Sequence, residues 1–397
     1  MNSNLQRLFT ITQKPVRRII GLMSGTSLDG LDVALCAISG SGMDTRVELE
    51  QFDTVPYPIA VKDEIRKIFA KETISFQQLC LLNPWIAEHH ATWILQCLQQ
   101  WKIDPAEVDL IASHGQTVYH SPKILHQQAA FPNATLQIGD GDHIAVKTGI
   151  ITVSDFRQKH IAAGGEGAPL ALYGDYCLFS QAGEDRIMLN MGGIANFTFL
   201  PGTLDANAVF VTDTGPGNTL LDAFARAYFN VEYDKDAQFA KAGTVNEKLL
   251  AALKNNPFFQ EGFPRTTGPE LFNREYVYKA LQESQTDFLT PVDVMATLTQ
   301  FSADTITAAL LSVLDANKSY AVYMSGGGAH NPLLVDLIKA RMPNLQVSTT
   351  GELGIAGDAK EAVLFAILAN EAVMGQGINF GKPGMPAITM GKFSFPA

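Results

Sequence analysis

The chain has 397 residues, of which 46% are hydrophobic and 17% charged, and its formal net charge is −11. This length and composition predict a globular protein of two domains. The acidic balance excludes nonspecific binding to nucleic acid, which needs a basic surface. There is no run of 18 apolar residues and no signal peptide, so we expect no membrane span. The four scattered cysteines, without any CxxC pair, predict reduced thiols in a cytoplasmic protein.

The first half of the chain predicts alternating strands and helices after a loose leader before Arg18. Short β-branched runs indicate the strands, and apolar residues at helical spacing indicate the helices. The expected strands are Arg18–Met23, Leu31–Ile38, Val47–Val55, Val108–Ser113 and Ile150–Val153, and the expected helices are Ala60–Ala70, Phe76–Trp101 and Gly139–Lys147.

The second half begins again in the same style, with two strands around a glycine turn. Its expected strands are Arg186–Asn190, Asn196–Leu200, Ala208–Thr212 and Ala321–Ser325, and its expected helices are Asn218–Tyr228, Val245–Leu253, Val292–Leu314, Pro332–Ala340 and Glu361–Met374. We therefore expect a duplicated α/β architecture, with a nucleotide and a second substrate bound between two lobes.

Glycine-rich loops follow or interrupt several of these strands: Gly21–Gly30, Asn190–Asn196, Asp213–Asn218 and Gly326–Gly328. Glycine lets backbone N–H groups approach an anion closely, so loops of this kind favour a polyphosphate ligand. Each loop taken alone is equally compatible with a hairpin turn or a flexible connection. None of them is a Walker A loop or a Rossmann fingerprint.

Asp213 is the first candidate for a general base. It ends an apolar strand and precedes Thr-Gly-Pro-Gly-Asn and a helix, where α/β folds place reacting groups. A nearby helix N-terminus would hold it ionised and ready to accept a proton. The alternative is an aspartate that only caps the helix or closes an Asx turn.

Other polar residues are compatible with either a role in the site or a purely structural role. Asp358 and Glu361 open the last long helix, either as favourable charges at its N-terminus or as a second acid of the site. Arg157 either clamps a substrate carboxylate or forms a surface ion pair. A zinc site at the three histidines His114, His120 and His126 is not expected, because their spacing is wrong. Trp85, Trp93 and Trp101 are expected in a helix core.

In combination, the motifs resemble those of the anhydro-N-acetylmuramic acid kinase family, part of the hexokinase–actin ATPase superfamily. The resemblance covers the chain from about residue 18 onward, in order. It is carried by Gly21-Leu-Met-Ser-Gly-Thr-Ser-Leu-Asp-Gly30, Ser113-His-Gly-Gln-Thr117, Asp155-Phe-Arg157 with the run 162–169, Asp213-Thr-Gly-Pro-Gly-Asn218 and Gly326-Gly-Gly328.

This resemblance implies two duplicated α/β lobes of the actin/hexokinase-like, ribonuclease H-like type around an ATP cleft. The implied N-terminal lobe is 1–160 with 375–397 packing back on it, and the implied C-terminal lobe is 161–374. The implied reaction uses ATP and water to convert 1,6-anhydro-N-acetylmuramic acid to N-acetylmuramic acid 6-phosphate, in cytoplasmic recycling of cell-wall peptidoglycan.

The resemblance also implies roles for residues. Asp213 would be the base that activates water, and Glu361 matches the family's second carboxylate. The sugar would contact Gln116, Arg157, Asn196 and Gly215. ATP, with Mg²⁺, would be bound by Gly21, Leu22, Met23, Ser24, Gly25, Thr26, Ser27, Asp29, Gly192, Gly193, Gly326, Gly327, Gly328 and Asn331.

The chain departs from the expected pattern in three places. Met23 and Asn190 stand where the superfamily commonly has aspartate, so the Mg²⁺ ligands are unknown, with Asp29 and Asp32 as candidates. Residues 158–160 depart from an arginine-rich run in the family, which leaves Arg157 as the expected contact of the lactyl carboxylate.

Two rival functions are weighed against this one. A kinase of an ordinary sugar hydroxyl would use Asp213 to deprotonate that hydroxyl directly. An actin-like or chaperone-like ATPase would form filaments or need a protein partner. The expected partners are small molecules, not nucleic acid or membrane, and a homodimer is common for chains of this size.

Overall fold

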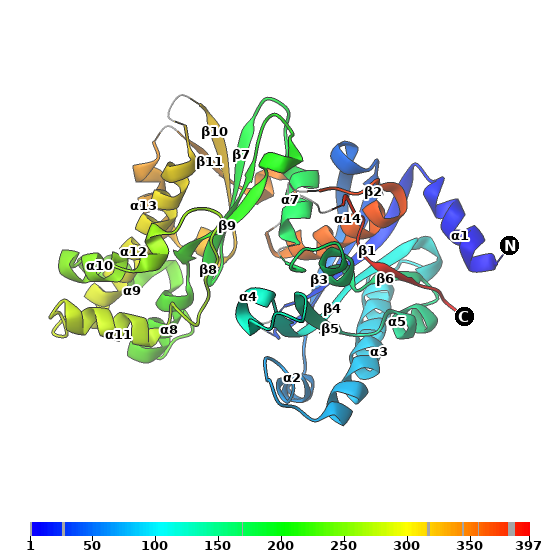
Figure 1. The fold of residues 1–397 in the computed structure, drawn as a ribbon, viewed down its shortest axis with the longest axis horizontal. Coiled ribbons are helices and arrows are strands. Elements are labelled where there is room, and N and C mark those ends of the chain that lie inside the picture. The colour runs from blue at the N-terminus through cyan, green and yellow to red at the C-terminus, as the bar shows by residue number, and fades with distance from the viewer. Residues whose placement is uncertain are drawn as a thin grey trace. The chain divides into compact units, whose positions relative to one another are not determined.

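The computed structural model describes residues 2–25, 28–168, 170–315, 318–343, 345–355, 357–379 and 386–397. The chain forms two compact units: unit 1 comprises Met1–Phe179 and Asp358–Ala397, and unit 2 comprises Ser180–Gly357. The boundaries expected from the sequence put 161–179 and 358–374 in the second lobe. Both stretches belong to unit 1 because helix α14 (Lys360–Met374) packs on strands β1 and β2 and on helix α7 (Figure 1).

Unit 1 is built on a mixed sheet with the order β12-β6-β4-β1-β2-β3, and β5 pairs with β4. The first three strands form an antiparallel meander, while β4 and β6 run parallel to β1. The strands are β1 (Val16–Ser24), β2 (Gly30–Ser39), β3 (Arg46–Pro56), β4 (Leu110–Ser121), β5 (Ala134–Ile138), β6 (Ile151–Ser154) and β12 (Lys392–Ser394).

Helices cover both faces of this sheet, since its central strands are apolar on both sides. Helix α3 contributes Ile86 and Trp93 to a core that also contains Leu22 and Leu31 of the meander. The N-cap of α3 is Ser75, and the helix ends at the left-handed residue Lys102. The helices are α1 (Ser3–Thr12), α2 (Ile59–Arg66), α3 (Phe76–Trp101), α4 (Lys123–His126), α5 (Gly141–Thr148), α6 (Phe156–Ala162), α7 (Ala171–Phe179) and α14.

Unit 2 repeats the same sheet design with the order β11-β10-β7-β8-β9. Strands β7, β8 and β9 form an antiparallel meander, and β10 and β11 run parallel to β7. The strands are β7 (Asp185–Met191), β8 (Ile194–Leu200), β9 (Phe210–Pro216), β10 (Tyr320–Ser325) and β11 (Gln346–Thr349). The duplication expected from the sequence is thus confirmed, because the five strands of unit 2 match β6-β4-β1-β2-β3 of unit 1 in order and direction.

The helices of unit 2 bury two apolar clusters, one of them around the long helix α12. Thr290 caps α12, and a proline follows in its first turn, which suits a helix start. The helices are α8 (Thr219–Phe229), α9 (Gln238–Ala242), α10 (Glu247–Lys254), α11 (Arg274–Glu283), α12 (Pro291–Val313) and α13 (Pro332–Arg341).

Most of the expected elements are present, and α3 has the predicted bounds. The leader is an exception, since α1 is a helix with Asn2 as its N-cap. Arg7 of α1 bonds to the carbonyl of Gly149 at 2.7 Å, and Ile11 is buried. These tertiary contacts order a segment whose own sequence carries a weak signal.

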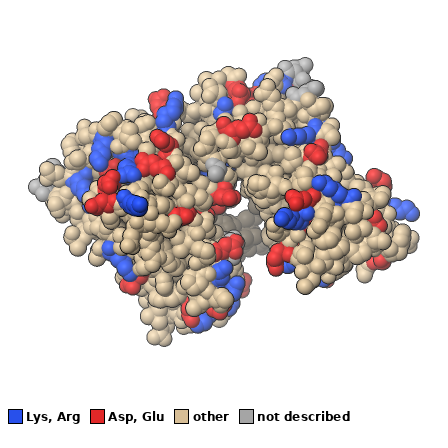
Figure 2. All heavy atoms as spheres, turned by 180° about the vertical axis from the view of Figure 1, so that it is seen from behind, with Lys and Arg blue, Asp and Glu red and all other residues tan. Residues whose placement is uncertain are grey.

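The surface and the thiols agree with the composition. Acidic and basic side chains are interspersed on the face seen in Figure 2, without a basic patch. All four cysteines are free, and Cys80 alone is exposed. In the described part of the chain, no helix is both long and apolar enough to cross a membrane.

Candidate active site

Asp213 lies on β9, the edge strand of the unit 2 sheet, at an irregularity in its pairing. Asn196 of β8 faces Asp213, and Ala195 faces Gly215, so Thr214 is an extra residue without a register partner on β8, although its hydroxyl donates to the carbonyl of Ala195 at 3.0 Å. A bulge of this kind bends the strand and changes the direction of a side chain, and such bulges often occur beside active sites.

A separate loop covers the free edge of β9 and holds Asp213 from that side. The amide of Asp213 donates to the carbonyl of Arg265 at 3.0 Å, and the amide of Thr267 donates to Asp213 Oδ2 at 2.8 Å. The hydroxyl of Thr212 accepts from the amide of Arg265 at 2.9 Å. The carboxylate therefore has a fixed direction, as a catalytic group requires.

The environment of Asp213 suits a general base that works near neutral pH. Burial raises the pKa of the half-buried carboxyl to about 6, and Glu270 acts in the same direction. The amide of Thr267 and the charge of Arg265 oppose this shift. A base is most effective when its pKa lies close to the working pH.

Sequence reasoning missed the segment Arg265–Thr267 altogether. It lies in a stretch without helical or strand periodicity, and its importance comes from pairing with an edge strand 50 residues earlier. The only local signal is the run Pro264-Arg-Thr-Thr-Gly268, whose turn residues and hydroxyls are compatible with an ordinary loop.

The structure brings three glycine-rich segments of unit 2 together. The amides of Gly217 and Asn218 donate to the carbonyls of Gly193 and Gly192, both at 2.8 Å. At Gly326 φ is +81°, and a Cβ there would lie 2.6 Å from Oδ1 of Asn190. The hairpin turn, the turn before α8 and the glycine run after β10 thus form one backbone-rich surface.

The other predicted residues of unit 2 have different surroundings. Asn196 is half-buried and is the cross-strand neighbour of Asp213, so the two side chains lie on one face of the sheet. Gly215 is buried. Asn331, expected to contact ATP, is the N-cap of α13, and its Oδ1 accepts from the amide of Leu334 at 3.1 Å.

In unit 1, the first glycine loop is only partly what the sequence suggested. Gly21 and Leu22 are buried within β1, where a Cβ at position 21 would lie 1.9 Å from the carbonyl of Ala362. Both residues therefore pack the strand against α14 or the core and do not form a surface for ATP. Met23 is half-buried at the end of β1, and Gly25 and Asp29 reach the surface. Thr26 and Ser27 lie outside the described residues.

Ser24 and Gln116 form a buried hydrogen-bond network beneath the surface of the first glycine loop. Ser24 Oγ lies 2.5 Å from Gln116 Oε1 and 2.6 Å from Tyr57 Oη, which in turn lies 2.8 Å from His90 Nε2. All four side chains are buried. Gln116 also donates to the carbonyls of Gly25 and Thr117. Gln116 is thus buried and bonded to protein at both ends of its amide, and its predicted contact with the sugar stays a prediction.

Arg157 lies in the first turn of α6 and keeps a hydrogen-bond donor available. Its Nε donates to Nε2 of His114 at 3.0 Å, and its Nη1 donates to the carbonyl of Gly167 at 2.6 Å. Burial lowers the pKa of His114 to about 3, so this imidazole is neutral and accepts the bond. Nη2 of Arg157 has no hydrogen-bond partner among the described residues and can meet a carboxylate.

Glu361 starts α14 beside several charged groups of unit 1. Its side chain is solvent-accessible, yet protein surrounds it on several sides. This desolvation raises the pKa of Glu361, as do Asp32 and Asp175, while Lys360 and Arg157 oppose the shift. Asp32 is half-buried, and the negative charges of Asp358 and Asp29 add to the burial that raises its pKa.

Asp29 and Asp32 suit a divalent cation that is held mainly by substrate phosphates and water, and not one that is coordinated by protein side chains alone. Within the described ranges there is no group of three or more His, Cys, Asp or Glu residues that could hold a metal ion. Mg²⁺ commonly binds to one or two carboxylates and substrate phosphates, keeping several waters. Asp29 and Asp32 meet that requirement, since one is exposed and the two interact electrostatically.

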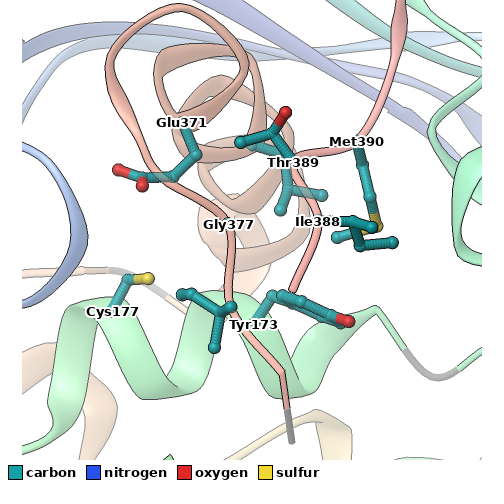
Figure 3. Close-up of a pocket in the computed structure, with 9 residues that line it drawn as sticks. Tyr173, Cys177, Glu371, Gly377, Ile388, Thr389 and Met390 are labelled. Carbon is teal, nitrogen blue, oxygen red and sulfur yellow. The ribbon is translucent and has the colours of Figure 1, made fainter. Parts of the chain in front are cut away.

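Two cavities lie apart from these residues. One, of about 10 Å³, lies in unit 1 between α7 and the C-terminal segment, where Tyr173 and Cys177 face Ile388 and Met390 (Figure 3). It has room for about one water molecule. The other, of about 310 Å³, lies in unit 2 between the loop 259–265 and α12, and Arg265 forms part of its wall.

Comparison with known proteins gives a consistent result. The family model described as anhydro-N-acetylmuramic acid kinase matches residues 17–382. The anhydro-N-acetylmuramic acid kinases of Pseudoalteromonas atlantica and Pseudoalteromonas translucida are 54% and 52% identical over 400 and 399 residues, covering 100% of both chains in each case.

Likeness to solved structures is more distant. Component A of the (R)-2-hydroxyglutaryl-CoA dehydratase of Acidaminococcus fermentans covers 90% of this chain and 99% of its own, at 10% identity and a TM-score of 0.41. The strand order of the two units therefore defines the fold, and the sequence defines the family. On the strength of the full-length matches, the chain belongs to the anhydro-N-acetylmuramic acid kinase family.

Proposed function

We propose that this kinase opens the anhydro bridge of 1,6-anhydro-N-acetylmuramic acid with water and phosphorylates the oxygen that is released. Water attacks C1 and gives its proton to Asp213, the C1–O6 bond breaks, and O6 takes the γ-phosphoryl group of ATP. The products are N-acetylmuramic acid 6-phosphate and ADP. We assign the reaction to the cytoplasmic recovery of cell-wall sugars.

One observation carries this proposal: Asp213 combines a fixed direction with a pKa of about 6. The amide of Thr267 bonds to Oδ2, while Oδ1 accepts no hydrogen bond from the described residues. Oδ1 is then the atom that takes the proton of the attacking water. A positioned base of this kind contributes roughly 10²–10⁴ in rate.

Each unit offers side chains that suit the polar groups of the sugar. Arg157 suits the lactyl carboxylate because its Nη2 is open and a hydrogen bond from a guanidinium to a carboxylate is charge-assisted. Asn196 suits a hydroxyl or the acetamido group, since it neighbours Asp213 on the same face of the sheet. Glu361 would interact with the sugar or with a water molecule bound to the sugar. Arg157 is near enough to lower the pKa of Glu361.

The phosphates would be bound mainly by backbone. Gly192, Gly193 and the run Gly326–Gly328 form the close-packed glycine surface of unit 2, and Gly25 with Asp29 forms the loop of unit 1. Asp29 and Asp32 would hold Mg²⁺, which supplies charge neutralisation of the transferred phosphoryl group. Alignment and charge stabilisation are what phosphoryl transfer requires from a protein.

Isotope labelling tests the proposed bond changes. The enzyme is run with ATP and the anhydro sugar in ¹⁸O water, and the product is quenched early and analysed by mass spectrometry. We expect one ¹⁸O at the C1 oxygen and none in the phosphate ester. Unlabelled product, incubated in the same water for the same time, controls for exchange at the anomeric carbon.

The rival sugar kinase gives a different result in the same assay. An enzyme that only phosphorylates a free hydroxyl would consume ATP with open N-acetylmuramic acid and not with the anhydro sugar, which has no free 6-hydroxyl. ATP consumption confined to open sugars, or product without enzymatic label at C1, would rule out the proposed reaction.

A further inference from the structure

We infer that Arg265 is a positioning residue for Asp213, acting through the backbone of the bulge in β9. The inference rests on the proposed role of Asp213 as the base. It concerns a residue outside every sequence motif discussed above, on a loop that pairs with the edge of the sheet.

The guanidinium of Arg265 binds the bulge itself. Its Nε donates to the carbonyl of Asp213 at 3.2 Å, and its Nη2 donates to the carbonyl of Thr214 at 3.4 Å. Thr214 is the extra residue of the bulge, so the ladder with β8 does not pair it. A buried carbonyl without a partner is costly, and a bulge therefore needs a donor from outside the ladder.

A third bond and three phenyl rings fix the guanidinium in turn. Nη1 donates to the carbonyl of Phe258 at 2.9 Å. The guanidinium carbon lies 4.5 Å from the ring centre of Phe258, 4.8 Å from that of Phe263 and 5.9 Å from that of Phe259. Arginine suits this place because its planar guanidinium carries donors on three separate nitrogens and stacks flat on rings, whereas a lysine ammonium has all its donors on one nitrogen.

Arg265 also affects the pKa of Asp213. It is the cation that lowers the pKa of this carboxyl, against burial and Glu270, which raise it. Strand β8, on the other side of β9, has no ionisable residue. On helix α12, which also packs on β9, Asp304 is ion-paired with Lys254 and Arg341, and Asp293 bonds to the amide of Thr244.

Two substitutions separate the geometry from the charge. Arg265→Lys keeps the charge and loses the fork, so we expect kcat to fall roughly 10–10²-fold, because displacements of about 1 Å cost rates of this order. The acid limb of the pH profile should stay close to its wild-type position. Arg265→Met loses both the fork and the charge, so kcat should fall further. Because the charge of Arg265 lowers the pKa of Asp213, its loss should raise that pKa and move the acid limb to higher pH.

Arg17→Met is the matched control for lost packing. Arg17 is a buried arginine of unit 1 whose three nitrogens bond to Asn370 and to the carbonyls of Lys14 and Gly40. Its loss should lower the unfolding midpoint about as much as Arg265→Met, while kcat and the pH profile remain those of the wild type.

A chemical rescue gives an independent readout. The 310 Å³ pocket beside Arg265 offers a small cation access to the space that Arg265→Ala leaves. We expect millimolar guanidinium or methylguanidinium to restore kcat at least tenfold, and methylammonium at equal concentration to have no such effect. Guanidinium is kept well below denaturing concentrations, and Arg17→Ala is treated in parallel.

The outcomes distinguish this inference from the proposed function. Loss of activity in Asp213→Asn, together with Arg265 variants that keep kcat within threefold and an unmoved acid limb, would overturn the inference alone. An Asp213→Asn variant with near wild-type activity would overturn the proposed function and the inference with it. Reduced kcat, a limb shifted only in Arg265→Met, and rescue by guanidinium support the inference.

Discussion

The backbone amide of Thr267 donates a 2.8 Å hydrogen bond to Oδ2 of Asp213, across 54 residues of sequence. It fixes one carboxylate oxygen and leaves Oδ1 without a partner in the described part of the chain. Together with burial, this arrangement gives a base whose pKa is raised to about 6. The predictions below follow from this and from the contacts that support the two glycine-rich surfaces.

The first prediction concerns pH. Because Asp213 acts only when ionised and its pKa is about 6, kcat/KM should fall tenfold for each pH unit below that value. An ordinary aspartate would instead keep the profile level down to about pH 4. Initial rates between pH 4.5 and 8, with coupling enzymes in excess at each pH, decide between the two. A level profile through pH 5 contradicts the assignment.

The second prediction concerns the carboxylate of the sugar. Arg157→Lys should raise KM for the anhydro sugar by about 10–100-fold, because a lysine ammonium cannot bond to His114 and Gly167 and still present a donor to the carboxylate as the guanidinium does. The variant and the wild type are compared on 1,6-anhydro-N-acetylmuramic acid and on 1,6-anhydro-N-acetylglucosamine, which lacks the lactyl group. The difference between the enzymes should vanish on the second sugar. An equal defect on both sugars would show that Arg157 does not bind the carboxylate.

The third prediction concerns the support of the first loop. Ser24→Ala removes the hydroxyl between Tyr57 and Gln116 and leaves buried polar atoms unpaired, so unfolding should become easier by about 1–3 kcal/mol. KM for ATP should rise as the loop loosens. Ser113→Ala is the control, since Ser113 is buried on the neighbouring strand and its hydroxyl has no partner in the described ranges. Equal urea midpoints for the two variants would refute the supporting role of Ser24.

The fourth prediction concerns stability in acid. Burial lowers the pKa of His90 to about 3, so the folded chain keeps His90 neutral while the unfolded chain takes a proton below about pH 6.5. This contribution to stability is present above pH 6.5 and is lost as the pH falls from 6.5 towards 3. Between pH 6.5 and 5.0, the wild type should lose about 1.5 kcal/mol more than His90→Gln. Urea unfolding at both pH values measures this difference, and equal losses would contradict it.

The sequence predicted the parts of this protein that depend on local patterns. Strand β1 and helix α3 carry their own periodicity, and the two halves repeat one order of elements. The glycine runs at 192–193 and 326–328 were predicted to bind the nucleotide together, and the structure brings them together in unit 2. Their contact with ATP stays a prediction.

What the sequence could not predict depends on contacts between distant segments. Gly21 lies in a motif that is typical of a phosphate loop, but its missing Cβ makes room for the carbonyl of Ala362. Gln116 is expected to bind the sugar, but it is buried and bonds to Ser24, Gly25 and Thr117. Arg265 carries no local signal, because its role arises only when its loop meets the edge of β9.

The most direct test of the account is the turnover of Asp213→Asn at saturating ATP and anhydro sugar. Asp222→Asn is the control, because Asp222 is also half-buried in unit 2 with a pKa raised to about 6 and is not among the residues assigned to the proposed site. We predict that kcat of Asp213→Asn falls by at least ~10³, the loss expected for a base and its charge, while Asp222→Asn stays within threefold of the wild type. A kcat for Asp213→Asn within tenfold of the wild type would show that Asp213 is not the base.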